Sequence, residues 1–124
     1  MVLIAMDGEE VGRVYNQTVR DTMAWRKVGP EEFLWQESPV SDVAIAWRAY
    51  VLHNNRLQPV KWVSPDWDNT YLPVAASRRD GAGINVRFDP DGTITYLGTG
   101  TWEDKTYQYR WNSSTLTFKG ELRK

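Results

Sequence analysis

Large apolar residues occupy every second position through much of the C-terminal third of the chain, and many of them are aromatic. Polar residues fill the positions between them. Side chains at alternate positions of a strand point to opposite faces of a sheet, so this pattern predicts an antiparallel meander with one apolar and one polar face. The expected strands cover residues 84–88, 93–102, 106–111 and 115–122, and the inward positions are Ile84, Val86, Phe88, Ile94, Tyr96, Trp102, Tyr107, Tyr109, Trp111, Leu116, Phe118 and Leu122.

Two glycines, Gly98 and Gly100, fall on the same inward face as these rings. Glycine in a strand favours strong coiling, and its missing side chain leaves room among bulky neighbours. A closed barrel also removes the exposed edges that an open aromatic sheet would present. We therefore expect an all-β fold, a small antiparallel β-barrel of about eight strands, whose interior is incompletely filled.

The N-terminal part of the chain has a more mixed pattern. Residues 2–6 are rich in β-prone side chains. Residues 11–26 fit two patterns, because Val11 and Val19 belong to a helical stripe whereas Val19, Met23 and Trp25 partly fit a strand. The favoured interpretation is a short helix that leads into a strand near 22–28.

The middle of the chain, residues 43–63, predicts a β-hairpin. Its turn is His53-Asn54-Asn55, since asparagine tolerates positive φ. Pro59 indicates an edge or a bulge in the returning arm. A helix over 43–51 is the competing interpretation, and the symmetric arms favour the hairpin.

Composition narrows the classes of function. A chain of 124 residues suits one domain, residues 1–124, with its own core. The net charge of −1 and the lack of clustered basic residues give no support to nucleic-acid binding. No run has the length of a membrane span, and no signal-peptide core is present, so a cytoplasmic location is expected. With no cysteine, a single histidine (His53) and no nucleotide-binding motif, neither a metal nor an organic cofactor is expected.

Four short motifs in the C-terminal third of the chain resemble motifs of the lipocalin-like (calycin) barrel domains: Phe88-Asp-Pro-Asp-Gly92, Gly98-Thr-Gly-Thr-Trp102, Tyr109-Arg-Trp111 and Leu116-Thr-Phe118. The resemblance covers the last third of the chain. In that family a Gly-x-Trp motif opens the first strand, whereas Gly100-Thr-Trp102 lies near the C-terminus here. The resemblance implies a cupped barrel that holds a small apolar or aromatic molecule.

The inward aromatic residues are the candidate binding site. Such a cavity would be lined by rings, with tyrosine hydroxyls as the few polar groups that orient a ligand. The alternative is a packed core, because a barrel of about eight strands lies between filled and ligand-holding sizes. Trp67, in the polar loop 64–70, is a candidate lid. The predicted ligand-binding residues are Trp47, Trp67, Tyr96, Gly98, Gly100, Trp102, Tyr107, Tyr109 and Trp111.

Two other functions use the same residue types. A cofactor-independent cyclase or isomerase would use tyrosine hydroxyls as hydrogen-bond donors and a loop carboxylate such as Asp66 as the base. A protein-interaction module, viral or accessory, would expose Trp35, Trp62 and Trp67 in one apolar patch. The central hairpin, with Trp47, Tyr50 and Trp62, either lines the cavity or forms a homodimer face.

Overall fold

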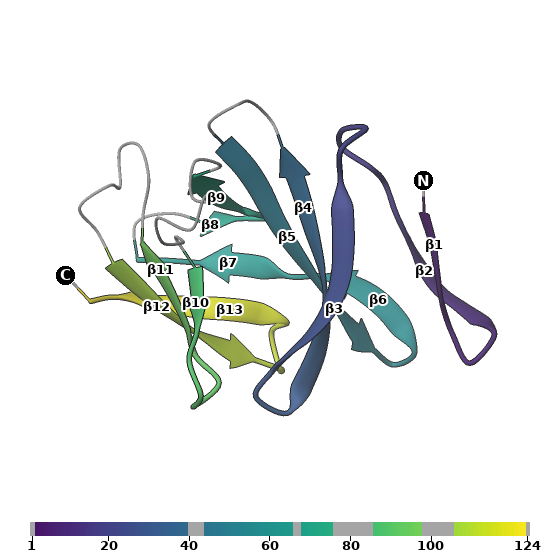
Figure 1. The fold of residues 1–124 in the computed structure, drawn as a ribbon. Helices are drawn as coiled ribbons and strands as arrows, with labels where there is room; N and C mark the ends of the chain where they lie inside the picture. Colours follow the sequence, from purple (N-terminus) through teal and green to yellow (C-terminus); the bar gives the residue numbers. More distant parts are fainter. Residues whose placement is uncertain (1, 40–43, 66–67, 76–85, 98–105, 124) are drawn as a thin grey trace.

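The protein is an all-strand structure, as seen in a computed structural model that describes residues 2–39, 44–65, 68–75, 86–97 and 106–123 (Figure 1). Within these ranges there is no helix long and apolar enough to cross a membrane. The strands are β1 (Val2–Met6), β2 (Glu9–Val14), β3 (Thr22–Val28), β4 (Glu31–Pro39), β5 (Ala44–His53), β6 (Arg56–Pro59), β7 (Lys61–Val63), β8 (Asp68–Asn69), β9 (Leu72–Ala75), β10 (Val86–Phe88), β11 (Ile94–Leu97), β12 (Thr106–Asn112) and β13 (Thr117–Leu122).

Two larger sheets and one separate hairpin make up the fold. The first sheet has the order β3-β4-β5, and both β6 and β9 pair with the other side of the long strand β5. The second sheet has the order β10-β11-β12-β13-β7-β8, in which only the β13–β7 pair is parallel. Strands β1 and β2 form an antiparallel hairpin of their own.

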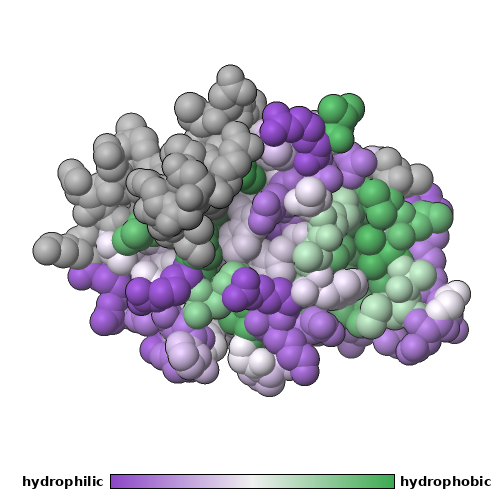
Figure 2. Space-filling model, in the orientation of Figure 1, coloured by the Kyte–Doolittle hydropathy of each residue, from purple (hydrophilic) through white to green (hydrophobic). Residues whose placement is uncertain are grey.

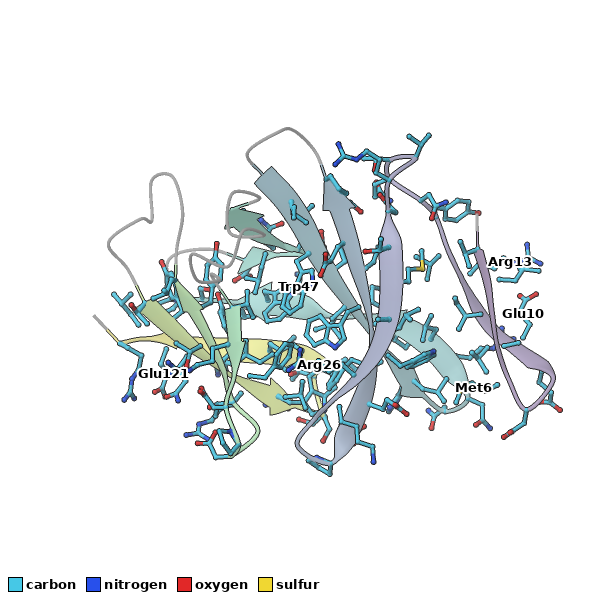
Figure 3. The ribbon with its side chains drawn as sticks, viewed as in Figure 1. Met6, Glu10, Arg13, Arg26, Trp47 and Glu121 are labelled. Atoms are coloured by element: carbon cyan, nitrogen blue, oxygen red, sulfur yellow. The ribbon has the colours of Figure 1, made fainter. Side chains whose placement is uncertain are left out.

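The chain passes from the first sheet to the second at Val60, between β6 and β7. The Val60 amide donates a 2.9 Å hydrogen bond to the Ala49 carbonyl on β5, so the crossing segment stays tied to the first sheet. The two sheets diverge from this crossing, and the buried aromatic residues lie between them (Figure 3).

The expected closure into a barrel is wrong for the part of the chain that the structure describes, because no backbone ladder joins β3 to β10. A closed barrel needs such a ladder, with strands about 4.8 Å apart. These two edges meet through side chains instead: the guanidinium carbon of Arg26 on β3 lies 3.7 Å from the ring centroid of Phe88 on β10. The architecture is therefore a pair of sheets that remain open along one side.

The predicted C-terminal meander is confirmed in β10 to β13, which pair antiparallel in chain order. Its second strand is described only as far as Leu97, so Gly98, Gly100 and Trp102 lie outside the described residues. Leu122 is 47% exposed rather than inward. The alternation otherwise holds, and the buried members are Val86, Ile94, Tyr96, Tyr107, Tyr109 and Phe118.

The predicted central hairpin is confirmed as β5 and β6, but its returning arm ends at Pro59, because residues 61–63 form β7 and pair with β13 and β8 in the second sheet. Asn54 and Asn55 have φ values of 53° and 61°, the left-handed conformation that a tight hairpin turn requires. Trp47, Ala49 and Val51 point into the core from β5, as period-two spacing requires. The competing helix over 43–51 is excluded for residues 44–51.

The expected helix within 11–26 is wrong, whereas the strand at its end is confirmed as β3. Val11 and Val14 are buried in a strand that pairs with β1, and Val19 is fully exposed, so the apparent helical stripe faces no common surface. The Asp21 side chain accepts hydrogen bonds from the Gln17 and Thr18 amides, and these bonds hold the segment as a loop.

Candidate functional site

Three rings on adjacent strands form one wall of the space between the sheets. Trp111 on β12, Phe118 on β13 and Trp62 on β7 face one another directly in the strand register. The Phe118 centroid lies 5.1 Å from that of Trp111 and 4.6 Å from that of Trp62. Aligned cross-strand pairs of this kind bring large rings into contact and stabilise the sheet.

The opposite wall comes from β4. Phe33 meets Trp111 edge-on at 4.9 Å and Phe118 at 5.1 Å. Trp35 lies 6.0 Å from Trp62. The two walls together contribute five rings, and Trp47 and Phe88 add two more at the open side. We call these seven rings the aromatic cluster: Phe33, Trp35, Trp47, Trp62, Phe88, Trp111 and Phe118.

The open side between β3 and β10 brings an aromatic pair close to the surface. Trp47 stacks on Trp35 with centroids 4.3 Å apart, and Phe88 meets both rings edge-on at 5.7 Å and 5.5 Å. Arg26 covers the face of Phe88, and its backbone carbonyl accepts a 3.3 Å hydrogen bond from Trp35 Nε1. Figure 3 places Arg26 and Trp47 in the space between the two sheets.

The tyrosines of the predicted site are buried in the same core, on the inner face of the second sheet. The hydroxyls of Tyr109 and Ser64 share a 2.6 Å hydrogen bond, and the Tyr96 hydroxyl donates to the Pro73 carbonyl at 2.5 Å. Tyr107 stacks beside Tyr96, with centroids 6.1 Å apart. The hydroxyls of Tyr96 and Tyr109 therefore form hydrogen bonds within the protein, as expected if they belong to a packed core.

Two indole groups of the cluster have no such partner. The Nε1 atoms of Trp62 and Trp111 are buried, and neither has a hydrogen-bond acceptor in the part of the chain that the structure describes. A buried donor without an acceptor costs about 1–3 kcal/mol, so such donors are rare in folded proteins. Among the described residues of the cluster, these two indole groups are the buried donors that lack a partner.

The structure brings part of the predicted set of residues together. Of the predicted residues, Trp47, Tyr96, Tyr107, Tyr109 and Trp111 all point between the sheets, whereas Trp67, Gly98, Gly100 and Trp102 lie outside the described residues. Sequence reasoning missed Arg26, Phe33, Phe88 and Phe118 as site residues. The alternation of Phe33 and Trp35 is the signal that could have placed β4 in the wall.

The exposed tryptophan patch expected for an interaction module is wrong at two of its three positions. Trp35 is 4% exposed and Trp62 is fully buried. The third position, Trp67, lies outside the described residues. Trp47 is also buried, so Trp47 and Trp62 of the expected dimer face both turn inward, whereas Tyr50 is half-buried and donates its hydroxyl to Gln36 Oε1 at 2.8 Å.

Asp21 is the most strongly hydrogen-bonded carboxylate that the structure describes, and it lies away from the cluster. It bonds Gln36 and Ser38, which point to the face of β4 opposite Trp35. Burial raises the pKa of Asp21, but the hydrogen bonds from the Gln17 amide and these side chains outweigh burial, so the pKa is lowered overall.

Asp89 and Asp91 lie in the turn between β10 and β11. A hydrogen bond from Thr95 and then one from Arg87 lower the pKa of Asp89, and bonds from the Thr93 side chain and backbone lower that of Asp91. A lowered pKa makes a carboxylate a weaker base. The predicted catalytic carboxylate, Asp66, lies outside the described residues. Over the described ranges, no group of three acidic or histidine side chains is placed to hold a metal ion.

Comparisons of the chain with protein-family models, curated proteins and solved structures found no match.

Proposed function

We propose that the protein binds a small planar aromatic molecule that carries a hydrogen-bond acceptor, and that the ligand lies against the aromatic cluster between the two sheets. The single observation that carries the proposal is the pair of buried indole donors, Trp62 and Trp111, without acceptors. A carbonyl or ring nitrogen of a ligand would satisfy such a donor, and a planar ring would stack among its neighbours.

The open side of the sheets offers a route to these rings. Among the described strands no backbone ladder joins β3 to β10, and Arg26 is an exposed residue that lies over Phe88. An exposed cation–π contact is worth about 0.5–1 kcal/mol, far less than several ladder hydrogen bonds. A change of the Arg26 rotamer would therefore uncover Phe88 and the neighbouring Trp47 at small cost.

The proposal is tested by titration with two planar probes of similar size. Coumarin carries a carbonyl acceptor and naphthalene carries none. We expect saturable quenching of tryptophan fluorescence and a higher melting temperature with both probes, and about two- to tenfold tighter binding of coumarin, because one net hydrogen bond contributes about 0.5–1.5 kcal/mol. Absence of saturable binding by either probe would overturn the proposal.

Two variants identify the donor. Trp62→Phe and Trp111→Phe each keep an aromatic ring and remove one N–H. We expect one of them to abolish the preference for coumarin while naphthalene binding changes less. Trp25→Phe is the matched control, because Trp25 lies on the opposite face of β3 and is 37% exposed. Since the chain has seven tryptophans, each variant retains the fluorescence signal. If both variants keep the wild-type preference, the indole donors have no role in binding.

A further inference from the structure

The outer strand of the N-terminal hairpin has a free edge of unusual composition. β1 pairs with β2 on one side, and no described strand pairs with its other side. Its five residues, Val-Leu-Ile-Ala-Met, include no charge, no proline and no polar side chain. Charged residues and proline usually protect the edge strands of natural proteins, because the exposed backbone donors and acceptors of an edge pair readily with another strand.

The hairpin stands at one end of the molecule, and the first sheet lies between it and strands β10 to β13 (Figure 1). Its inner strand β2 is fixed to the body: Val11 and Val14 are buried, and Gly12 lies so close to Leu57 of β6 that a Cβ atom would come within 2.6 Å of the Leu57 Cβ. The outer strand is accessible, with Leu3 58% exposed. Figure 2 shows hydrophobic atoms gathered on this side of the molecule, over the hairpin.

We propose that β1 is a homodimer interface, in which it pairs antiparallel with β1 of a second copy of this chain about a two-fold axis at Ile4. This pairing would join two marginal two-stranded hairpins into one four-stranded sheet. Ile4 would face Ile4 of the partner subunit, Leu3 would face the partner's Ala5, and Val2 would face the partner's Met6. Every facing pair is apolar.

The charges on β2 favour a second copy in this orientation. Arg13 lies beside Leu3 and Glu10 lies beside Ala5 in the hairpin register. In the antiparallel pairing the two rows that contain Leu3 and Ala5 would each have Arg13 at one end and Glu10 of the other subunit at the opposite end, so opposite charges share a row. A parallel in-register pairing would place like charges at both ends of the same rows, which is unfavourable.

Sedimentation velocity over a range of concentrations tests the interface. We expect the wild-type chain to form a species of twice the monomer mass, and we expect Leu3→Lys to remain monomeric, because lysine on an edge opposes strand addition. Val19→Lys is the control: Val19 is fully exposed in the loop before β3, and its replacement should leave the dimer intact. A wild-type chain that is monomeric at every concentration, or a dimer unaffected by Leu3→Lys, would overturn the inference.

Cysteine cross-linking tests the register, since the chain has no native cysteine. Two Ile4→Cys subunits would place their Cα atoms about 4.5–5.5 Å apart, within disulfide range. Two Val2→Cys subunits would be displaced by four residues along the strands, about 14 Å, which is too far. Under mild oxidation with copper–phenanthroline, we expect cross-linked dimer for Ile4→Cys and little for Val2→Cys. Equal cross-linking of both variants would contradict the proposed axis. This interface does not depend on ligand binding at the aromatic cluster.

Discussion

Replacing Asp21 with alanine removes one carboxylate that accepts five hydrogen bonds from both sides of a loop–sheet contact. On the loop side the donors are the Gln17 amide at 2.7 Å and the Thr18 amide and hydroxyl at 3.0 Å and 2.7 Å. On the sheet side they are Gln36 Nε2 at 2.8 Å and Ser38 Oγ at 3.0 Å. The Asp21 side chain thus connects the loop before β3, at Gln17 and Thr18, to β4 through hydrogen bonds.

The cost of Asp21→Ala follows from the burial of these donors. Gln36 and Ser38 are fully buried, so each loses an acceptor that water does not readily replace. A buried donor without its acceptor costs about 1–3 kcal/mol, whereas exposed loop amides are largely rehydrated. Gln36 Nε2 also donates to the Tyr15 carbonyl at 3.0 Å, which reduces its loss. We expect Asp21→Ala to lower the free energy of unfolding by about 2–4 kcal/mol at pH 7.

The effect should depend on pH with a defined sign. Because the folded-state pKa of Asp21 lies below its ordinary value of 3.8, its stabilisation is complete above that value and disappears as the pH falls through the folded-state pKa. Urea unfolding followed by tryptophan fluorescence measures the difference between wild type and variant from pH 7 to pH 2. The difference should stay constant down to about pH 5 and shrink below about pH 4.

The control is Asp68→Ala, because Asp68 is an exposed residue on β8. Its replacement should change the free energy of unfolding by less than about 0.5 kcal/mol. The reasoning fails if Asp21→Ala costs less than about 1 kcal/mol at pH 7, or if the difference from wild type is unchanged at low pH.

Two further substitutions probe the packing around Tyr109. A Cβ atom on Gly120 would lie 2.5 Å from Tyr109 Cε1, and the ring is fully buried, so Gly120→Ala should lower the unfolding free energy by about 1–3 kcal/mol in urea titrations. Lys119→Ala, at the exposed neighbouring position, should have little effect. Ser64→Ala removes the 2.6 Å bond to the Tyr109 hydroxyl and should cost about 1 kcal/mol. The double variant with Tyr109→Phe should cost less than the sum of the single changes, and strict additivity would argue against this bond.

The parts of the fold that the sequence predicts are those that depend on neighbouring residues. Alternation places Tyr107 and Tyr109 on one face of β12 because a strand has a fixed period of two. The turn at Asn54 and Asn55 is predictable for the same reason, since the required positive φ is a property of those two residues.

The parts that the sequence does not predict depend on which distant edges meet. The parallel pairing of β7 with β13 places Trp62 opposite Phe118, which lies 56 residues further along the chain. Barrel closure depends on the contact between β3 and β10, where Arg26 meets Phe88 through side chains. Local patterning carries no information on such contacts, and for this reason neither the open side nor the unsatisfied indole donors could be foreseen.

Strand β4 shows why one local pattern gave an incomplete view of the fold. Phe33 and Trp35 point to the aromatic cluster, but Leu34, Gln36 and Ser38 on the other face are buried as well. Alternation of apolar and polar residues normally indicates one wet face, so Gln36 and Ser38 suggest exposure. They are covered instead by the segment that contains Asp21, whose carboxylate satisfies both side chains. A polar residue on an inner strand can thus be buried when a distant loop supplies its hydrogen-bond partner. The Asp21 carboxylate holds residues 17–21 as a loop instead of the predicted helix, and the same carboxylate accepts hydrogen bonds from Gln36 and Ser38 on the buried face of β4.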